Sequence, residues 1–217
     1  MINLIRKDFA LTFKMRSLIV FALYFFLLIT LADNLNSDSR YILIITTIAY
    51  FLSSETFIYD DKTKSYYVIN SLPIKRSDVV ISKYLSIIVY IIVAIISVGL
   101  AGAFISSTKL ISGINLINLK VIKYVILSSF IIMAINFPIY FKYGFRQAKL
   151  LNFIIYFTFF TLINAAQSIL SLEAVESFIT FMAKNSTVIN SLSLVMVLIF
   201  TIISMLISIK IYDKKDM

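Results

Sequence analysis

Long apolar runs separated by short polar segments dominate this chain of 217 residues. A hydrocarbon core about 30 Å thick needs roughly 20 apolar residues per helix. Six stretches fit, although the first is short and would need a thinner patch of bilayer or a continuing preceding helix. The six stretches are Ser17–Ala32, Tyr41–Tyr59, Tyr84–Ile105, Val121–Phe141, Leu150–Leu170 and Val188–Ile209. The pattern predicts six transmembrane helices.

The apolar runs also define the fold class. Residues 87–93 are continuously apolar, whereas the strands of a membrane barrel would alternate apolar and polar residues. The longest polar segment, residues 60–83, is too short to fold as a soluble domain. We therefore expect an all-α integral membrane protein with one transmembrane domain over residues 1–217.

Composition narrows the chemistry that the chain can perform. Hydrophobic residues make up 60% of the sequence and charged residues 14%, which excludes a water-soluble monomer. The chain has no His and no Cys, so it lacks the usual general base, the usual zinc ligand and any thiolate nucleophile. We expect no catalytic residue, no metal site and no enzyme activity of its own.

The basic residues predict the orientation in the membrane, because Lys and Arg resist translocation. The two tails and every second loop hold fifteen of the twenty: Arg6, Lys7, Lys14, Arg16, Lys62, Lys64, Lys75, Arg76, Lys83, Lys142, Arg146, Lys149, Lys210, Lys214 and Lys215. The remaining loops hold Arg40, Lys109, Lys120, Lys123 and Lys184. Both termini are therefore expected in the cytoplasm. This bias and attraction to anionic lipid explain the net charge of +9 without nucleic-acid binding.

Two polar segments show apolar residues at helical spacing. Residues 1–16 carry Ile2, Ile5, Phe9 and Phe13 beside basic residues, which predicts an amphipathic helix at the cytoplasmic interface. Residues 171–187 carry a similar stripe on the outer side, at Leu172, Val175, Phe178, Ile179 and Met182. That stripe indicates an interfacial or re-entrant helix, and the alternative is a simple loop.

The segment of residues 60–83 is the most informative polar segment. Pro73 suits the first turn of a helix, and Ser77 with Asp78 can cap a helix that runs from about Ser77 to Ile105. Such a helix would be about 43 Å long and would project beyond the hydrocarbon core. Mixed charge beside apolar Leu72 and Ile74 predicts a docking surface. The alternative is a solvated hairpin whose charges only set the topology.

Four motifs lie in the N-terminal part of the chain: Lys7-Asp8, Tyr59-Asp60-Asp61-Lys62, Ser71-Leu72-Pro73-Ile74-Lys75-Arg76 and Ser82-Lys83-Tyr84. They resemble landmarks of the small six-span permease subunits of bacterial type-2 ABC exporters, which include exporters of phenol-soluble modulin-like and antimicrobial peptides. The resemblance covers the whole chain in span number and topology. Asp61 departs from the family pattern, because the family usually has Glu there.

The resemblance implies that two permease chains, identical or homologous, form a pathway in the bacterial plasma membrane and that two separate ATPase chains drive it. The four glycines do not have the spacing of a phosphate-binding loop. We therefore expect the ATPase to bind ATP and Mg, and this chain to bind no cofactor. By similarity, the coupling residues would be Asp60, Asp61, Lys62, Lys64, Leu72, Pro73, Ile74, Lys75 and Arg76.

Polar and small residues inside the apolar stretches are further candidates. Glu55 can pair with Lys14 or Arg16, or reach the interface alone. Asn136 and Pro138 predict a kink and a candidate hinge. Close helix packing is expected at Gly99, Gly102, Asn164, Ala165, Ala166 and Gln167, where amides can add interhelical hydrogen bonds.

The cargo is the least defined expectation. Apolar and aromatic stretches with almost no internal charge suit hydrophobic or amphipathic cargo, and the resemblance points to cytolytic or antimicrobial peptides. Three alternatives remain: a secondary transporter, an intramembrane enzyme, and a non-transporting immunity or sensor protein. The first two have little support, because broken helices, midplane charges and paired acids are scarce.

Overall fold

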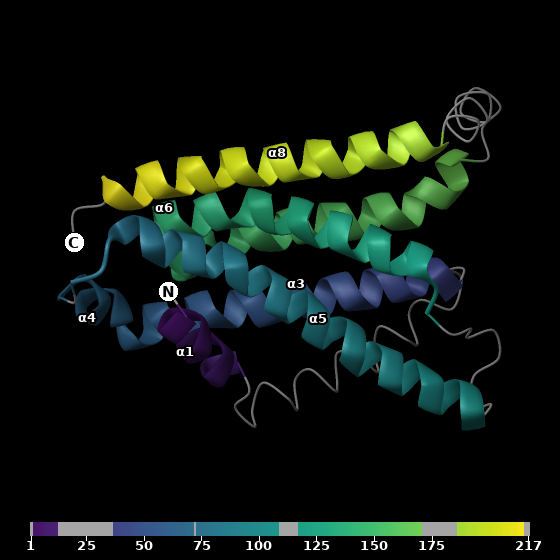
Figure 1. The fold of residues 1–217 in the computed structure, drawn as a ribbon, viewed down its shortest axis with the longest axis horizontal. Coiled ribbons are helices and arrows are strands. Elements are labelled where there is room, and N and C mark those ends of the chain that lie inside the picture. Colours follow the sequence, from purple (N-terminus) through teal and green to yellow (C-terminus); the bar gives the residue numbers. More distant parts are fainter. Residues whose placement is uncertain (1, 13–36, 72, 109–116, 171–185, 215–217) are drawn as a thin grey trace.

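The computed structural model describes residues 2–12, 37–71, 73–108, 117–170 and 186–214. Every regular element in these ranges is a helix, as the sequence predicted (Figure 1). The helices are α1 (Ile2–Thr12), α3 (Ser37–Thr63), α4 (Ser65–Ser71), α5 (Arg76–Thr108), α6 (Leu119–Leu170) and α8 (Ser186–Asp213).

Four helical segments are long and apolar enough to cross a membrane, namely Ser37–Thr63, Arg76–Ala103, Leu119–Ala148 and Leu192–Asp213. They contain or overlap the second, third, fourth and sixth predicted spans. The first predicted span lies outside the described residues. The fifth is helical, but most of its side chains lie outside the described part. The count of six spans therefore stays a prediction.

The backbone of α6 is broken at one residue. Gly144 has φ 73° and ψ 165°, which joins two helices end to end. The chain turns back there, so that both ends of α6 lie at the same end of the molecule (Figure 1). We expected residues 142–149 to form a loop between two spans. The structure instead has helix on both sides of Gly144, because a single glycine makes the turn.

Helix α3 lies at the centre of the bundle and packs against α1, α4, α5 and α6. It is buried over most of its length, including hydroxyl residues such as Thr47 and Ser54. These hydroxyls donate to carbonyl groups one turn earlier, from Thr47 to Leu43 and from Ser54 to Tyr50, so both are satisfied within the helix. In contrast, α8 exposes most of its apolar side chains, as a lipid-facing or partner-facing helix does.

Helices α1 and α4 and the C-terminal end of α8 lie toward one end of the molecule (Figure 1). The predicted amphipathic helix of residues 1–16 is observed as α1, with residues 13–16 outside the described part. The segment of residues 60–83 is more helical than a loop, because α3 continues to Thr63 and α4 follows directly. The outer segment, residues 171–187, is described only where α8 begins at Ser186.

Helix α5 begins one residue before the predicted start. The carbonyl group of Lys75 accepts a hydrogen bond from the backbone N–H of Asp78, at 2.9 Å. Ser77 is therefore inside the first turn, and our expectation that it caps the helix was wrong. Pro73 lies before the helix, in the link from α4. Asp78 does lie in the first turn, where a carboxylate suits the positive end of the helix dipole.

Candidate functional site

Four charged side chains from three helices meet at the end of the bundle that holds α1 and α4. We call Lys7, Asp8, Asp60 and Lys83 the Lys83 network. The ammonium group of Lys83 lies 2.7 Å from Asp60 Oδ2 and 3.1 Å from Asp8 Oδ2. The ammonium group of Lys7 lies 3.0 Å from Asp60 Oδ1 and 3.5 Å from Asp8 Oδ1. Each cation therefore contacts both carboxylates.

The network is largely buried and carries no net charge. The side chains of Lys83 and Asp8 are 5% and 2% exposed, while Asp60 and Lys7 are 19% and 33% exposed. Two cations and two anions cancel, which offsets much of the desolvation cost of burying charge. Ser65, the first residue of α4, also donates a hydrogen bond to Asp60 Oδ1 at 2.6 Å. The network thus joins α1, α3 and α5, and Ser65 adds α4.

This assembly was only partly predicted. All four residues belong to the motifs that carry the family resemblance, but Asp60 alone was a candidate coupling residue, and no contact among the four was predicted. The sequence does carry a signal, because Lys83 interrupts an apolar run that extends from Val79 through α5. A charge at that position needs a partner, and an acid on another helix is the natural one.

Asp61 binds a different partner from its neighbour Asp60. Its Oδ2 accepts a hydrogen bond from the backbone N–H of Arg146 at 2.9 Å. This amide belongs to the first turn after the break at Gly144, so Asp61 caps the second half of α6. A side chain at Gly144 would meet the Asp61 carboxylate, because an added Cβ would lie 3.2 Å from Oδ1. Gly144 was not among the predicted site residues.

We predicted a kink and a hinge at Asn136 and Pro138. Pro138 does lie inside α6, but the residue with a non-helical backbone is Gly144. Proline lacks an N–H and so leaves the carbonyl of Ala134 without its helical partner. The hydroxyl of Ser204 on α8 donates to that carbonyl. Tyr84 on α5 joins the same group, with its hydroxyl 2.7 Å from Ser204 Oγ and 2.9 Å from Ser208 Oγ. Three helices are therefore linked at the proline.

The predicted coupling residues lie around α4, on the same end of the bundle as the Lys83 network. Lys62, Lys64, Pro73 and Lys75 are exposed, whereas Ile74 packs against the core. Tyr67 and Val68 of α4 are also exposed, by 56% and 63%. Leu72 lies outside the described residues. The surface around α4 thus combines basic and apolar side chains.

The side chain of Arg76 has a partner within the bundle. Its Nη1 donates a hydrogen bond to the backbone carbonyl of Asp213 at 2.8 Å. This bond joins the start of α5 to the end of α8. Arg76 therefore contributes to the assembly of the bundle as well as to the predicted docking surface.

The other candidate residues are spread through the bundle. Glu55 is half-buried in α3, and its predicted partners Lys14 and Arg16 lie outside the described residues. The Asn136 amide is buried and donates to Ile132 O at 2.8 Å, within α6. Gly102 lies against Tyr41 of α3, where a Cβ would clash, and Gly99 faces Ile117. The side chains of Asn164, Ala165, Ala166 and Gln167 are outside the described part.

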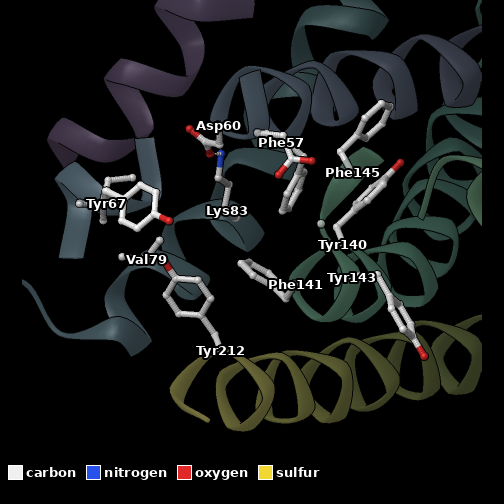
Figure 2. A pocket seen from close by; sticks show the side chains of 13 residues that line it. Phe57, Asp60, Tyr67, Val79, Lys83, Tyr140, Phe141, Tyr143, Phe145 and Tyr212 are labelled. Carbon is white, nitrogen blue, oxygen red and sulfur yellow. Dashed lines mark ion pairs between the residues drawn. The ribbon is translucent and has the colours of Figure 1, made fainter. Parts of the chain in front are cut away.

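A partly open cavity of about 280 Å³ lies between the Lys83 network and the turn at Gly144 (Figure 2). Aromatic rings form most of its wall, and Figure 2 shows Tyr67, Phe141 and Tyr212 around the space beneath Lys83. Asp60, Asp61 and Lys83 supply its charged groups. Among the residues that the structure describes, no three acidic, His or Cys side chains are grouped to hold a metal ion.

Comparison with known families supports a transport role. The model of the ABC-2 family transporter protein matches residues 3–213, which is nearly the whole chain. The comparisons with curated proteins and with solved structures found no match. The match includes the Lys83 network, the turn at Gly144 and all four membrane-crossing helices. The chain therefore belongs to the ABC-2 family of transporter proteins, which makes it a multi-pass membrane permease that associates with ABC ATPases.

Proposed function

We propose that this chain is the membrane-spanning subunit of an ATP-driven exporter, coupled to separate ATPase chains by residues 60–76. The observation that carries the proposal is the Lys83 network. It ties α1, α3 and α5 together directly beside α4 and the exposed residues Pro73 and Lys75. A force applied to α4 is therefore passed to two apolar helices at once.

The proposed mechanism is alternating access. Closure of two ATPase chains on ATP and Mg pushes α4, and the ion pairs move the ends of α3 and α5 as a unit. A second permease chain, identical or homologous, completes the pathway. This chain supplies no catalytic residue and binds no cofactor. In this arrangement α1, α4 and both termini face the cytoplasm of a bacterial cell, and the position of α1, α4 and the C-terminal end of α8 toward one end of the molecule supports that orientation (Figure 1).

The proposed cargo is a hydrophobic or amphipathic peptide of the cytolytic or antimicrobial kind. Support comes from the apolar stretches of the four described helices, each with 18 consecutive residues that include at most two charged side chains, and from α8, which exposes large apolar side chains along most of its length. Such a surface would give ions or sugars few polar partners. An amphipathic peptide can contact it without losing hydrogen bonds.

The first experiment is purification of the tagged chain from its native membrane in mild detergent, with measurement of the chains that co-purify and of their mass ratio. We expect an equimolar partner that carries a phosphate-binding G-x-x-x-x-G-K-[ST] motif. Recovery of the chain alone would contradict the exporter. Peptide release that persists after ATP depletion would indicate a secondary transporter, and protection of cells by a complex with an inactive ATPase would indicate an immunity protein.

A further inference from the structure

The cavity beside the Lys83 network has the size of one large side chain or a small amphiphile. Its volume of about 280 Å³ lies below the range of roughly 300–1,000 Å³ that holds drug-sized ligands. A folded peptide cannot enter it. A single head group on a short stem can.

The charge of the cavity is unbalanced toward the negative. Asp60 and Lys83 belong to the neutral network, so Asp61 is the carboxylate left over among the lining residues. Asp61 Oδ2 binds the amide of Arg146, and the described residues give Oδ1 no hydrogen-bond or ion-pair partner. One carboxylate oxygen is therefore available to a ligand.

The aromatic wall favours a cation. Seven of the lining residues are Phe or Tyr, and the faces of such rings attract positive charge. Two of these rings already contact ammonium groups of the chain itself. Lys83 Nζ lies 5.0 Å from the centre of the Phe57 ring, and Lys142 Nζ lies 4.9 Å from that of Tyr143.

We propose that this cavity binds an organic cation, a guanidinium or ammonium group on a short apolar stem. The head group pairs with Asp61 Oδ1, and the stem lies against the rings of Tyr67 and Phe141. A guanidinium fits best, because it stacks flat on aromatic rings while donating hydrogen bonds in its plane. The cation is either a side chain of the ATPase or a free organic cation.

The test uses the full chain, which contains no Trp. Tyr143→Trp places a single fluorescent reporter in the wall of the cavity. We expect saturable quenching or a spectral shift with butylguanidinium and none with butylurea, which has a similar shape and no charge. An equal response to both compounds would overturn the proposal.

Variants separate the site from the rest of the chain. Asp61→Asn keeps one oxygen to cap α6 and should weaken butylguanidinium binding at least about fivefold, whereas Asp38→Asn at the far end of α3 should leave it unchanged. Should Asp61→Asn fail to fold, Tyr67→Leu tests the aromatic wall, with Val68→Leu on the same helix as its control. Unchanged affinity in Asp61→Asn or Tyr67→Leu would refute the site.

Titration of the isolated chain does not need an ATPase, so its failure would leave the exporter proposal intact. A second titration of the complex with its ATPase identifies the source of the cation. Loss of butylguanidinium binding in the complex assigns the cation to an ATPase side chain. Unchanged binding assigns it to a free compound.

Discussion

Loss of the Lys83 charge should destabilise the chain, because Lys83 is buried and pairs with two carboxylates. Lys83→Met leaves Asp8 and Asp60 with only Lys7 between them, two carboxylates that are largely shielded from water. Removing one partner of a buried ion pair typically costs about 3–5 kcal/mol. We expect a clear loss of unfolding free energy in detergent, measured against the exposed control Lys62→Met.

The same network predicts a rescue. Adding Asp8→Asn to Lys83→Met restores a neutral network, because Lys7 and Asp60 then balance. The double variant should therefore be more stable than Lys83→Met alone, which a double-mutant cycle measures. A double variant that is as unstable as the sum of its single changes would show that packing, and not charge, holds α1 in place.

Gly144 is the residue on which the return of α6 depends. Its φ of 73° and ψ of 165° lie in a region open essentially to glycine alone. Gly144→Ala should cost about 1–3 kcal/mol from backbone strain, and the added Cβ also crowds Asp61. Gly99→Ala is the matched control, since among the described residues its Cβ would meet Ile117 alone, at an ordinary contact distance of 3.5 Å. Similar melting of the two variants would contradict this account.

At the scale of elements, Ser204 and Pro138 should depend on each other. Ser204→Ala removes the donor to the Ala134 carbonyl, at a cost of about 0.6 kcal/mol, typical of a hydrogen bond between membrane helices. In the Pro138→Ala background the helix supplies that donor itself, so the cost should be smaller and reflect only the lost bond to Tyr84. Ser208→Ala also loses a bond to Tyr84 but does not touch Ala134. Ser208→Ala should therefore lower the free energy of unfolding by the same amount with Pro138 and with Ala at that position, as unfolding measurements can check.

The elements were largely predictable, whereas their contacts were not. Four of the predicted apolar stretches overlap helices long enough to span a membrane, because that signal is local. The turn at Gly144 was missed, since a lone glycine between two helical patterns does not reveal its φ. The Lys83 network needs Lys7, Asp60 and Lys83 to meet, although they lie far apart along the chain. The positions of these residues along the sequence do not show that their side chains lie close together in the fold.

At the scale of the whole molecule, the proposed coupling surface can be separated from the contacts that hold the bundle together. Lys75 is exposed, and its one recorded partner among the described residues is the backbone N–H of Asp78, bound by its backbone carbonyl. The side chain of Arg76 also binds Asp213 at the end of α8. Lys75→Ala should therefore weaken only the contact with the ATPase, while Arg76→Ala should also lower the stability of the bundle.

This difference decides how the coupling is tested. We expect Lys75→Ala to keep the unfolding temperature of the parent chain and to lose both ATPase co-purification and peptide release. Pro73→Gly should lose the same two functions at a small cost in stability, because it loosens the link between α4 and α5 without removing a buried contact. Lys210→Ala, a basic residue on exposed α8, is the control for charge alone. Normal peptide release by well-expressed Lys75→Ala and Pro73→Gly would refute coupling through residues 60–76 and leave the ATPase to act elsewhere on the chain.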